Sequence, residues 1–253
     1  MPTDVPPITT PAQVLESTFT TVAPLLTSHG AFTPGSEHVQ PPTFDELGLY
    51  RGILLYETVL NGSGTGVLSF TEIRDRASVY LDGDPVGVLS RENHETSISL
   101  PSCSGRLIVL VEDQGRVNYG ARLGEHKGII GPALLDGEPV EGWTVRALDI
   151  DAVPTLPLQP SDPTAGPHIA RGAFDLEVPS DLFLDTSRWG KGLAWVNGFL
   201  LGRYWRRGPQ QTLFVPAPVT RPGRNDLVVL ELEVLGSSLV SFRDAASLGP
   251  TEL

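Results

Sequence analysis

The sequence has little cysteine, since Cys103 is the only one among 253 residues. One thiol cannot form an internal disulfide or a thiolate metal cluster, and the scarcity fits a reducing compartment. The first eleven residues, MPTDVPPITTP, have neither the basic nor the apolar stretch of a secretory signal. No apolar run reaches the roughly 18 residues that a membrane helix requires. We therefore expect a cytoplasmic protein that has no membrane partner.

Basic residues are also scarce. Eighteen Lys and Arg oppose 30 Asp and Glu, which gives a net charge of −12. Because this charge would repel a phosphate backbone, nucleic acid is not an expected partner. Long stretches without Gly or Pro are missing as well, and the longest, Val67 to Asp82, has 16 residues. The eight helices of a (β/α)₈ barrel, each roughly 10 to 15 residues long, therefore do not fit.

The motifs of several catalytic classes are missing. There is no G-x-S-x-G nucleophile elbow, no H-x-H or H-E-x-x-H zinc pair and no Walker loop. We therefore expect neither a metal nor a cofactor. The five histidines are expected in loops or on the surface: His29, His38, His94, His126 and His168.

Acidic residues are numerous enough for a general acid and base pair, which a glycosidase holds about 5 to 10 Å apart on a rigid floor. Four candidates lie at the edges of expected strands: Asp75, Glu112, Asp113 and Glu231. The sequence shows no accompanying cluster that would shift their pKa values. We therefore expect all four to be solvated or salt-bridged carboxylates on the surface.

What the sequence has in plenty is turn residues. Its 27 Gly and 23 Pro make up about a fifth of the chain, against a usual share of roughly 12%. Hydrophobic residues still amount to 40%, which is enough to fill a core. From about Leu47, short β-branched or aromatic runs alternate with Gly, Pro, Asn or Asp, a pattern typical of strands. We therefore predict an all-β fold.

The distribution of proline predicts the domain boundaries. Eight prolines fall in the first 42 residues, so residues 1–46 are expected to be a Pro-rich connector. Five more mark a linker over residues 153–167, which leaves 47–152 and 168–253 for two domains. Within the connector, Ala12–Leu26 is predicted as one short helix, because its apolar residues recur at spacings of three and four. These residues are Val14, Leu15, Phe19, Val22, Leu25 and Leu26.

An internal repeat supports two domains of one kind. Ser78–Gly87 and Leu193–Gly202 share an apolar strand, an Asp-Gly or Asn-Gly pair, two residues, an apolar stretch and Gly. Such pairs are typical of tight β-hairpin turns. Some twenty residues later each block continues into an apolar run, Gly105–Glu112 or Gly223–Glu231, as expected of strands buried on both faces. We predict two copies of one β-sandwich module.

Five aromatic residues fall within 17 residues of the second module: Trp189, Trp195, Phe199, Tyr204 and Trp205. Exposed indole rings on β-sandwiches can stack on sugar rings, whereas buried ones fill the core. For Trp195 and Phe199 we expect core packing between the sheets. For Trp205, which precedes Arg206 and Arg207, both interpretations stay open, and it is a candidate substrate-binding residue.

Seven segments carry a resemblance to a known family: Gly52–Leu60, Asp75–Gly83, Val111–Gly120, Lys127–Ile129, Trp189–Trp205, Gly208–Pro216 and Pro222–Leu232. In this order they resemble the C-terminal half of the β-galactosidases of glycoside hydrolase family 35, from about residue 43 to about 233. The resemblance implies that the two β-sandwich domains are jelly-roll, galactose-binding-like modules.

In that family, the resemblance implies, two glutamates on an N-terminal (β/α)₈ barrel remove terminal β-linked galactose with retention. The sequence contains neither the N-E-Y-G segment of the family's acid/base nor the S-E-[FW] segment of its nucleophile. No catalytic residue is therefore carried over. Tyr119, in an Asn-Tyr-Gly motif, is carried over as a substrate-binding residue, because the family's matching tyrosine lies on a loop that reaches the sugar pocket. A tyrosine that merely packs the loop is the equal alternative.

Three functional hypotheses follow. The chain is a non-catalytic accessory region that braces a catalytic (β/α)₈ barrel supplied elsewhere, it is a stand-alone module that binds galactosides, or it is a structural protein. Since a missing barrel leaves an apolar face, the third hypothesis predicts self-association or a protein partner. We favour the first, because the recognisable segments shape the sandwiches and few groups indicate an autonomous site.

Overall fold

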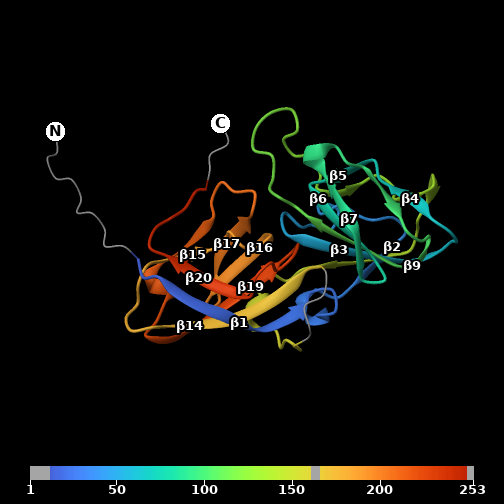
Figure 1. The fold of residues 1–253 in the computed structure, drawn as a ribbon. Helices are drawn as coiled ribbons and strands as arrows, with labels where there is room; N and C mark the ends of the chain where they lie inside the picture. The colour runs from blue at the N-terminus through green and yellow to red at the C-terminus, as the bar shows by residue number, and fades with distance from the viewer. Residues whose placement is uncertain (1–11, 161–165, 250–253) are drawn as a thin grey trace. The chain divides into compact units, whose positions relative to one another are not determined.

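The computed structural model describes residues 12–160 and 166–249, and it confirms the predicted all-β sandwich class (Figure 1). These two ranges hold 20 strands and four 3₁₀ turns, with no α-helix among them. Within the same ranges, no helix is long and apolar enough to cross a membrane. The chain divides into two compact units. We call residues 29–151 the insert unit, and residues 1–28 together with 152–253 the split unit.

The insert unit contains an antiparallel six-stranded sheet in the order β2-β13-β3-β9-β6-β7 and a four-stranded sheet in the order β12-β11-β4-β8. The strands of the first are β2 (Ser36–His38), β3 (Ile53–Asn61), β6 (Arg76–Leu81), β7 (Asp84–Ser90), β9 (Ser104–Glu112) and β13 (Trp143–Ala147). Those of the second are β4 (Gly66–Ser69), β8 (Ser97–Leu100), β11 (Leu134–Leu135) and β12 (Glu138–Pro139). A separate pair of strands, β5 (Glu72–Arg74) and β10 (Gly128–Ile130), also belongs to the insert unit. So do two 3₁₀ turns, η1 (His29–Ala31) and η2 (Arg91–Asn93).

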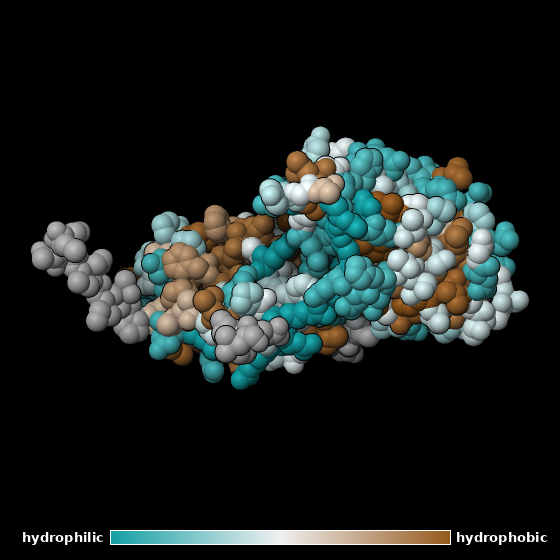
Figure 2. All heavy atoms as spheres, turned by 90° about the horizontal axis from the view of Figure 1, so that it is seen from above, coloured by the Kyte–Doolittle hydropathy of each residue, from teal (hydrophilic) through white to brown (hydrophobic). Residues whose placement is uncertain are grey.

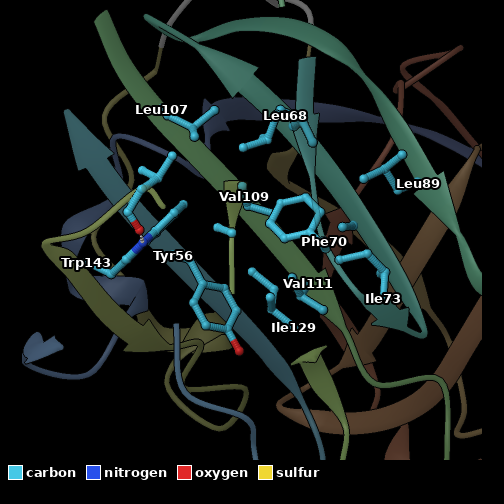
Figure 3. Close-up of a cluster of buried hydrophobic side chains, with 14 of the residues drawn as sticks. Tyr56, Leu68, Phe70, Ile73, Leu89, Leu107, Val109, Val111, Ile129 and Trp143 are labelled. Carbon is cyan, nitrogen blue, oxygen red and sulfur yellow. Dashed lines mark hydrogen bonds between the residues drawn. The ribbon is translucent and has the colours of Figure 1, made fainter. Parts of the chain in front are cut away.

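One cluster of buried apolar side chains joins the sheets of the insert unit (Figure 3). Val109 and Val111 of β9 point into it together with Leu68 of β4 and Ile129 of β10, and all four are fully buried. The side chains between them on β9, such as Leu110, point to the opposite face, because successive side chains of a strand alternate, and they are buried too. The prediction that this apolar run is buried on both faces is confirmed.

The split unit consists of eight antiparallel strands in the order β17-β16-β19-β14-β1-β20-β15-β18. They are β1 (Leu15–Pro24), β14 (His168–Leu176), β15 (Leu182–Asp185), β16 (Lys191–Val196), β17 (Phe199–Trp205), β18 (Thr212–Val215), β19 (Gly223–Glu231) and β20 (Leu239–Arg243). Two 3₁₀ turns accompany them, η3 (Val153–Thr155) and η4 (Ala217–Val219). Since β1 precedes the insert unit and the other seven strands follow it, the insert unit interrupts the split unit in sequence.

The expected helix over Ala12–Leu26 is wrong, because Leu15–Pro24 forms β1. The start of this strand pairs with β20 and the remainder pairs with β14, and the register shifts between Phe19 and Thr21. Such a bulge adds one residue, so the inward-facing apolar positions become Leu15, Phe19 and Val22. These spacings of four and three imitate the periodicity of a helix.

The segment predicted as a connector, residues 1–46, contains β1 and β2, and each is hydrogen-bonded in a sheet. Its described part therefore belongs to the two units and does not merely link them. Residues 1–11 of this segment, and residues 161–165 of the linker expected over 153–167, lie outside the described residues.

The repeated Asp-Gly and Asn-Gly pairs form the two predicted hairpins. Asp82 and Gly83 join β6 to β7, Asn197 and Gly198 join β16 to β17, and all four residues have positive φ. In each module the next long strand then pairs with the first strand of the hairpin. The turn is fastened to that strand in the same way twice: Asp82 exchanges hydrogen bonds of 2.9 and 2.7 Å with the backbone of Arg106. Asn197 exchanges two hydrogen bonds of 2.9 Å with the backbone of Asp226 on β19.

The assignment of β1 predicts which side chains in and next to this strand stabilise the split unit. Phe19 is 8% exposed and stacks on Trp189 with ring centroids 5.4 Å apart, whereas Val14 is 69% exposed. Phe19→Ala should lower the free energy of unfolding by about 3 to 5 kcal/mol, and Val14→Ala by less than about 0.5 kcal/mol. Urea unfolding followed by tryptophan fluorescence measures both. Equal losses would support a helix, in which both side chains share the apolar face.

Candidate functional site

The two predicted substrate-binding residues lie in different units. Tyr119 belongs to the insert unit, in the loop 113–127 between β9 and β10, and it is 90% exposed. Trp205 ends β17 in the split unit and is partly buried. The ammonium of Lys191 and the guanidinium of Arg207 each lie 4.8 Å from the centre of its indole ring. Cations thus already occupy the surface on which a sugar would stack, which favours a structural role for Trp205.

Of the two predictions of core packing for neighbouring aromatic residues, one is confirmed and one is wrong. Trp195 is 2% exposed, as expected of a core residue. Phe199 is 51% exposed, so its predicted core packing is wrong. It pairs with Val196 directly beside the Asn197 turn, at the tip of the hairpin, where the sandwich no longer covers it.

The expectation of surface carboxylates is also wrong. Asp75, Glu112, Asp113 and Glu231 are all at most 6% exposed. Glu231 accepts hydrogen bonds of 2.9 Å from the hydroxyl of Tyr204 and from the backbone N–H groups of Gly190, Lys191 and Glu233. Burial raises its pKa despite these donors. The carboxylate therefore ties β19 to its neighbours in the core of the split unit.

His168 departs from the expected loop or surface position. His168 lies on β14 and is 2% exposed, and burial lowers its pKa. Its Nδ1 lies 2.8 Å from the carbonyl oxygen of Gly166, so the ring is held by the backbone. Among the described residues, no group of three or more His, Cys, Asp or Glu side chains is arranged to hold a metal ion.

The loop of Tyr119 has a buried ionic foundation. The ammonium of Lys127, at the end of the loop, donates to both carboxylate oxygens of Asp75 at 2.8 and 2.9 Å. Lys127 is 1% exposed and Asp75 is 6% exposed. The carboxylate also accepts 2.9 and 3.0 Å hydrogen bonds from the guanidinium of Arg91 and the backbone N–H of Gln114, at the start of the loop. Asp75 therefore contacts both ends of the loop.

The electrostatics of Asp75 favour its charged form. Burial alone would raise the pKa of this carboxyl, but the hydrogen bonds from Lys127, Arg91 and Gln114 outweigh burial, so the pKa lies below its ordinary value. The ammonium of Lys127 thus compensates part of the cost of burying this carboxylate.

A second carboxylate in the loop extends this network. Glu125 receives two hydrogen bonds from the Arg91 guanidinium, at 2.5 and 3.0 Å. Arg122 lies 3.5 Å from Glu125 and 3.1 Å from Glu72, which also pairs with Arg74 at 2.6 Å. The ionic network thus connects the loop to β5 and to the turn after β7.

A second anchor joins the loop to the segment before β3. Asp45 accepts a 2.7 Å hydrogen bond from Arg116 at one oxygen and a 2.8 Å bond from the backbone N–H of Lys127 at the other. Arg116 also donates to the carbonyl oxygens of Leu49 and Tyr50, at 3.0 and 3.1 Å. Sequence reasoning did not find Asp45, Arg91 or Glu125, and it named Arg116 and Lys127 only as parts of family-like segments. The network escaped it because these charges come from separate positions in the chain.

The buried pair predicts the effect of removing one partner. Asp75→Asn leaves the ammonium of Lys127 with the carboxylate of Glu125, 3.5 Å away, as its remaining ion-pair partner among the described residues. We expect a loss of about 3 kcal/mol in the unfolding free energy of the insert unit. Hydrogen exchange of the β3 and β9 amides measures it. The matched control is Asp84→Asn on the exposed β6–β7 hairpin, which should change nothing, and an equal effect of the two would contradict the account.

The difference in unfolding free energy between the native chain and the Asp75→Asn variant should depend on pH. A carboxyl whose pKa is lower in the folded state stabilises the fold above its unfolded pKa, and this contribution disappears as the pH falls through the folded value. The difference between the two unfolding free energies should therefore be constant near neutral pH. It should become smaller as the pH falls below 3.8, the ordinary pKa of an aspartic acid. A difference that widens in acid would contradict the assigned charge of Asp75.

Comparison with known proteins agrees with this architecture. The family described as "Beta-galactosidase, first all-beta domain" matches residues 41–149, which include the anchored loop. The family described as "Beta-galactosidase, galactose-binding domain" matches residues 167–225. The two matches thus fall on β-rich parts of the insert unit and the split unit, respectively.

Individual β-galactosidases are similar to this chain over much of its length. That of Xanthomonas manihotis is 35% identical over 178 residues, which cover 69% of this chain and 30% of that protein. Those of Macaca fascicularis and Mus musculus are 36% and 34% identical, covering 76% and 85% of this chain and 32% and 37% of the respective proteins. The chain therefore spans about a third of the length of these relatives. It belongs to the β-galactosidase family as a region that contains the first all-beta domain and the galactose-binding domain.

Proposed function

We propose that this chain is the C-terminal accessory region of a β-galactosidase that acts on terminal β-galactosides. In this role the two units brace a catalytic (β/α)₈ barrel, and Tyr119 lines the sugar pocket of that barrel. The chain itself supplies no catalytic carboxylate. The proposal includes membership of glycoside hydrolase family 35 and a cytoplasmic location, as expected from the sequence.

One observation carries the proposal: Tyr119 is 90% exposed on a loop whose base is fixed by buried ion pairs. An aromatic side chain with so little contact contributes almost nothing to the core. The buried charges beneath it are costly unless they are well paired, so the base of the loop is held in this paired arrangement. A loop with a fixed base and an unused phenol at its tip fits a ligand-contacting role better than a packing role.

The buried carboxylates are consistent with the absence of a catalytic role. A retaining glycosidase needs two carboxyl groups that face a cleft about 5 Å apart. Glu231 is surrounded by four donors within the split unit, and Asp75 is neutralised by Lys127 and Arg91. Each of these groups already holds strands or loops together.

A stand-alone sugar-binding module is the second candidate, favoured by a groove in the split unit. This groove has a volume of about 780 Å³, and Phe183 and Phe214 line it together with Asp181. The two rings are cross-strand neighbours with centroids 5.6 Å apart, and Phe214 is 50% exposed. Aromatic rings beside a carboxylate are suitable for binding a sugar. Apolar side chains also interrupt the hydrophilic surface in several places (Figure 2).

The accessory role predicts that catalysis requires a barrel. The purified chain should not hydrolyse a nitrophenyl β-galactoside. A chimera in which this chain replaces the matching part of the Xanthomonas manihotis β-galactosidase should do so. In the chimera, Tyr119→Phe should lower kcat/KM about tenfold or more, since a phenol that contacts the sugar loses its hydrogen bond. Tyr50→Phe is the matched control, because Tyr50 is 78% exposed in the same unit.

Turnover by the chain alone that a carboxylate substitution abolishes would overturn the accessory role. So would an active chimera in which Tyr119→Phe behaves like Tyr50→Phe.

Calorimetry separates the two candidate functions. The accessory role predicts a flat titration of the isolated chain with galactose or lactose, because most of the pocket belongs to the barrel. Saturable heat that disappears in Phe214→Ala would favour the stand-alone module. Heat that disappears in Trp205→Ala would instead place the sugar on the indole and contradict the structural role assigned to Trp205.

A further inference from the structure

The tip of the loop 113–127 has few contacts of its own. Within the part of the chain that the structure describes, Val117, Asn118 and Tyr119 make no hydrogen bond to another residue. Beyond them, one turn is closed by Leu123 N–H to Gly120 O at 3.2 Å. The position of Tyr119 therefore depends on the residues that anchor the two limbs of the loop. The outgoing limb is the part before Tyr119, and the returning limb is the part after it.

Arg116 is the anchor that precedes Tyr119 most closely in sequence, by three residues. Its guanidinium donates to four oxygens: a carboxylate oxygen of Asp45 at 2.7 Å and the carbonyl oxygens of Leu49, Tyr50 and Glu125 at 3.0, 3.1 and 3.5 Å. Asp45, Leu49 and Tyr50 belong to the segment before β3, and Glu125 belongs to the returning limb of the loop. One side chain thus ties the outgoing limb to both.

Asp45 completes the arrangement. Its second oxygen accepts the backbone N–H of Lys127 at 2.8 Å, so one carboxylate holds the outgoing limb through Arg116 and the returning limb through Lys127. The side chains of Arg116 and Asp45 are 30% and 22% exposed, and neither belongs to the apolar core. Their contacts hold the loop above its base, whereas the buried pair of Asp75 and Lys127 fixes the base itself and stabilises the unit.

We propose that Arg116 is a positioning residue that, through Asp45 and the carbonyls of Leu49 and Tyr50, sets the location of Tyr119 for a galactoside. This proposal rests on the proposed function, in which Tyr119 contacts the sugar. The planar guanidinium is required because it presents five N–H donors in a fixed fork. A lysine keeps the charge but cannot reach the same oxygens together. A displacement of about 1 Å at a substrate contact can reduce turnover about a hundredfold.

The first part of the test uses the full chain alone and measures hydrogen exchange by mass spectrometry. In Arg116→Lys and Arg116→Ala, peptides covering residues 114–127 should exchange about tenfold faster. Once Arg116 no longer ties the loop to Asp45, the hydrogen-bonded amides of Leu123, Glu125 and Lys127 should open more often. Peptides from β3 and β9 should not change. Arg122→Lys is the matched control, since Arg122 lies in the same loop but is 58% exposed and bonds only to carboxylates that other arginines also hold. Unchanged exchange in the Arg116 variants would overturn the proposal.

The second part uses the chimera and separates this proposal from the proposed function. Arg116→Lys should lower kcat/KM about tenfold or more in the Tyr119 background. In the Tyr119→Phe variant, the same Arg116→Lys change should lower kcat/KM by less than about a further twofold, because positioning matters only for a phenol that contacts the sugar. If Tyr119→Phe itself has no effect, the proposed function fails. If Tyr119→Phe lowers kcat/KM and Arg116→Lys does not, or if the two effects multiply, only the positioning role fails. If the chimera is inactive, the exchange measurement on the chain decides the positioning role.

Discussion

The exposed loop depends on one buried interaction, the pairing of the Lys127 ammonium with both oxygens of Asp75. Two charges removed from water are tolerated only in close contact with further donors, which Arg91 and the backbone of Gln114 supply. Lys127 ends the loop and Gln114 begins it. Because Asp75 accepts hydrogen bonds from both, this one carboxylate brings the two ends of the loop together. Asp75 lies between β5 and β6 and Lys127 lies directly before β10, and the apolar core includes side chains of all three strands.

The fold was largely predictable where local sequence and tertiary structure agree. The Asp-Gly and Asn-Gly hairpins and the buried apolar runs are specified by turn chemistry and by hydrophobicity within a few residues. β1 was not predictable in this way, because a bulge at Thr20 gives a strand the apolar spacing of a helix. The pairing of β1 with β14 and β20 spans the whole insert unit, and no local pattern reports such a contact.

The candidate site was predictable only in part. Tyr119 came from the resemblance of its Asn-Tyr-Gly motif, and the structure adds that the phenol stands in solvent. Its anchors could not be read from the sequence, because Asp45, Asp75, Arg91 and Arg116 lie on four separated segments. In sequence they resemble ordinary surface charges, and only folding makes them a network. Phe199 shows the reverse error, since an apolar residue in an apolar strand proved to lie at an exposed hairpin tip.

The central claim is that Tyr119, held by this network, contacts the sugar of a β-galactosidase. Its most direct test is chemical nitration of the chimera with the Xanthomonas manihotis β-galactosidase, with and without galactose. Tyr119 and Tyr50 are 90% and 78% exposed in the chain, so both phenols are accessible to a reagent and Tyr50 serves as an internal control. The account predicts that saturating galactose protects Tyr119 from nitration and leaves Tyr50 reactive. Equal nitration of Tyr119 in the presence and absence of galactose would contradict it.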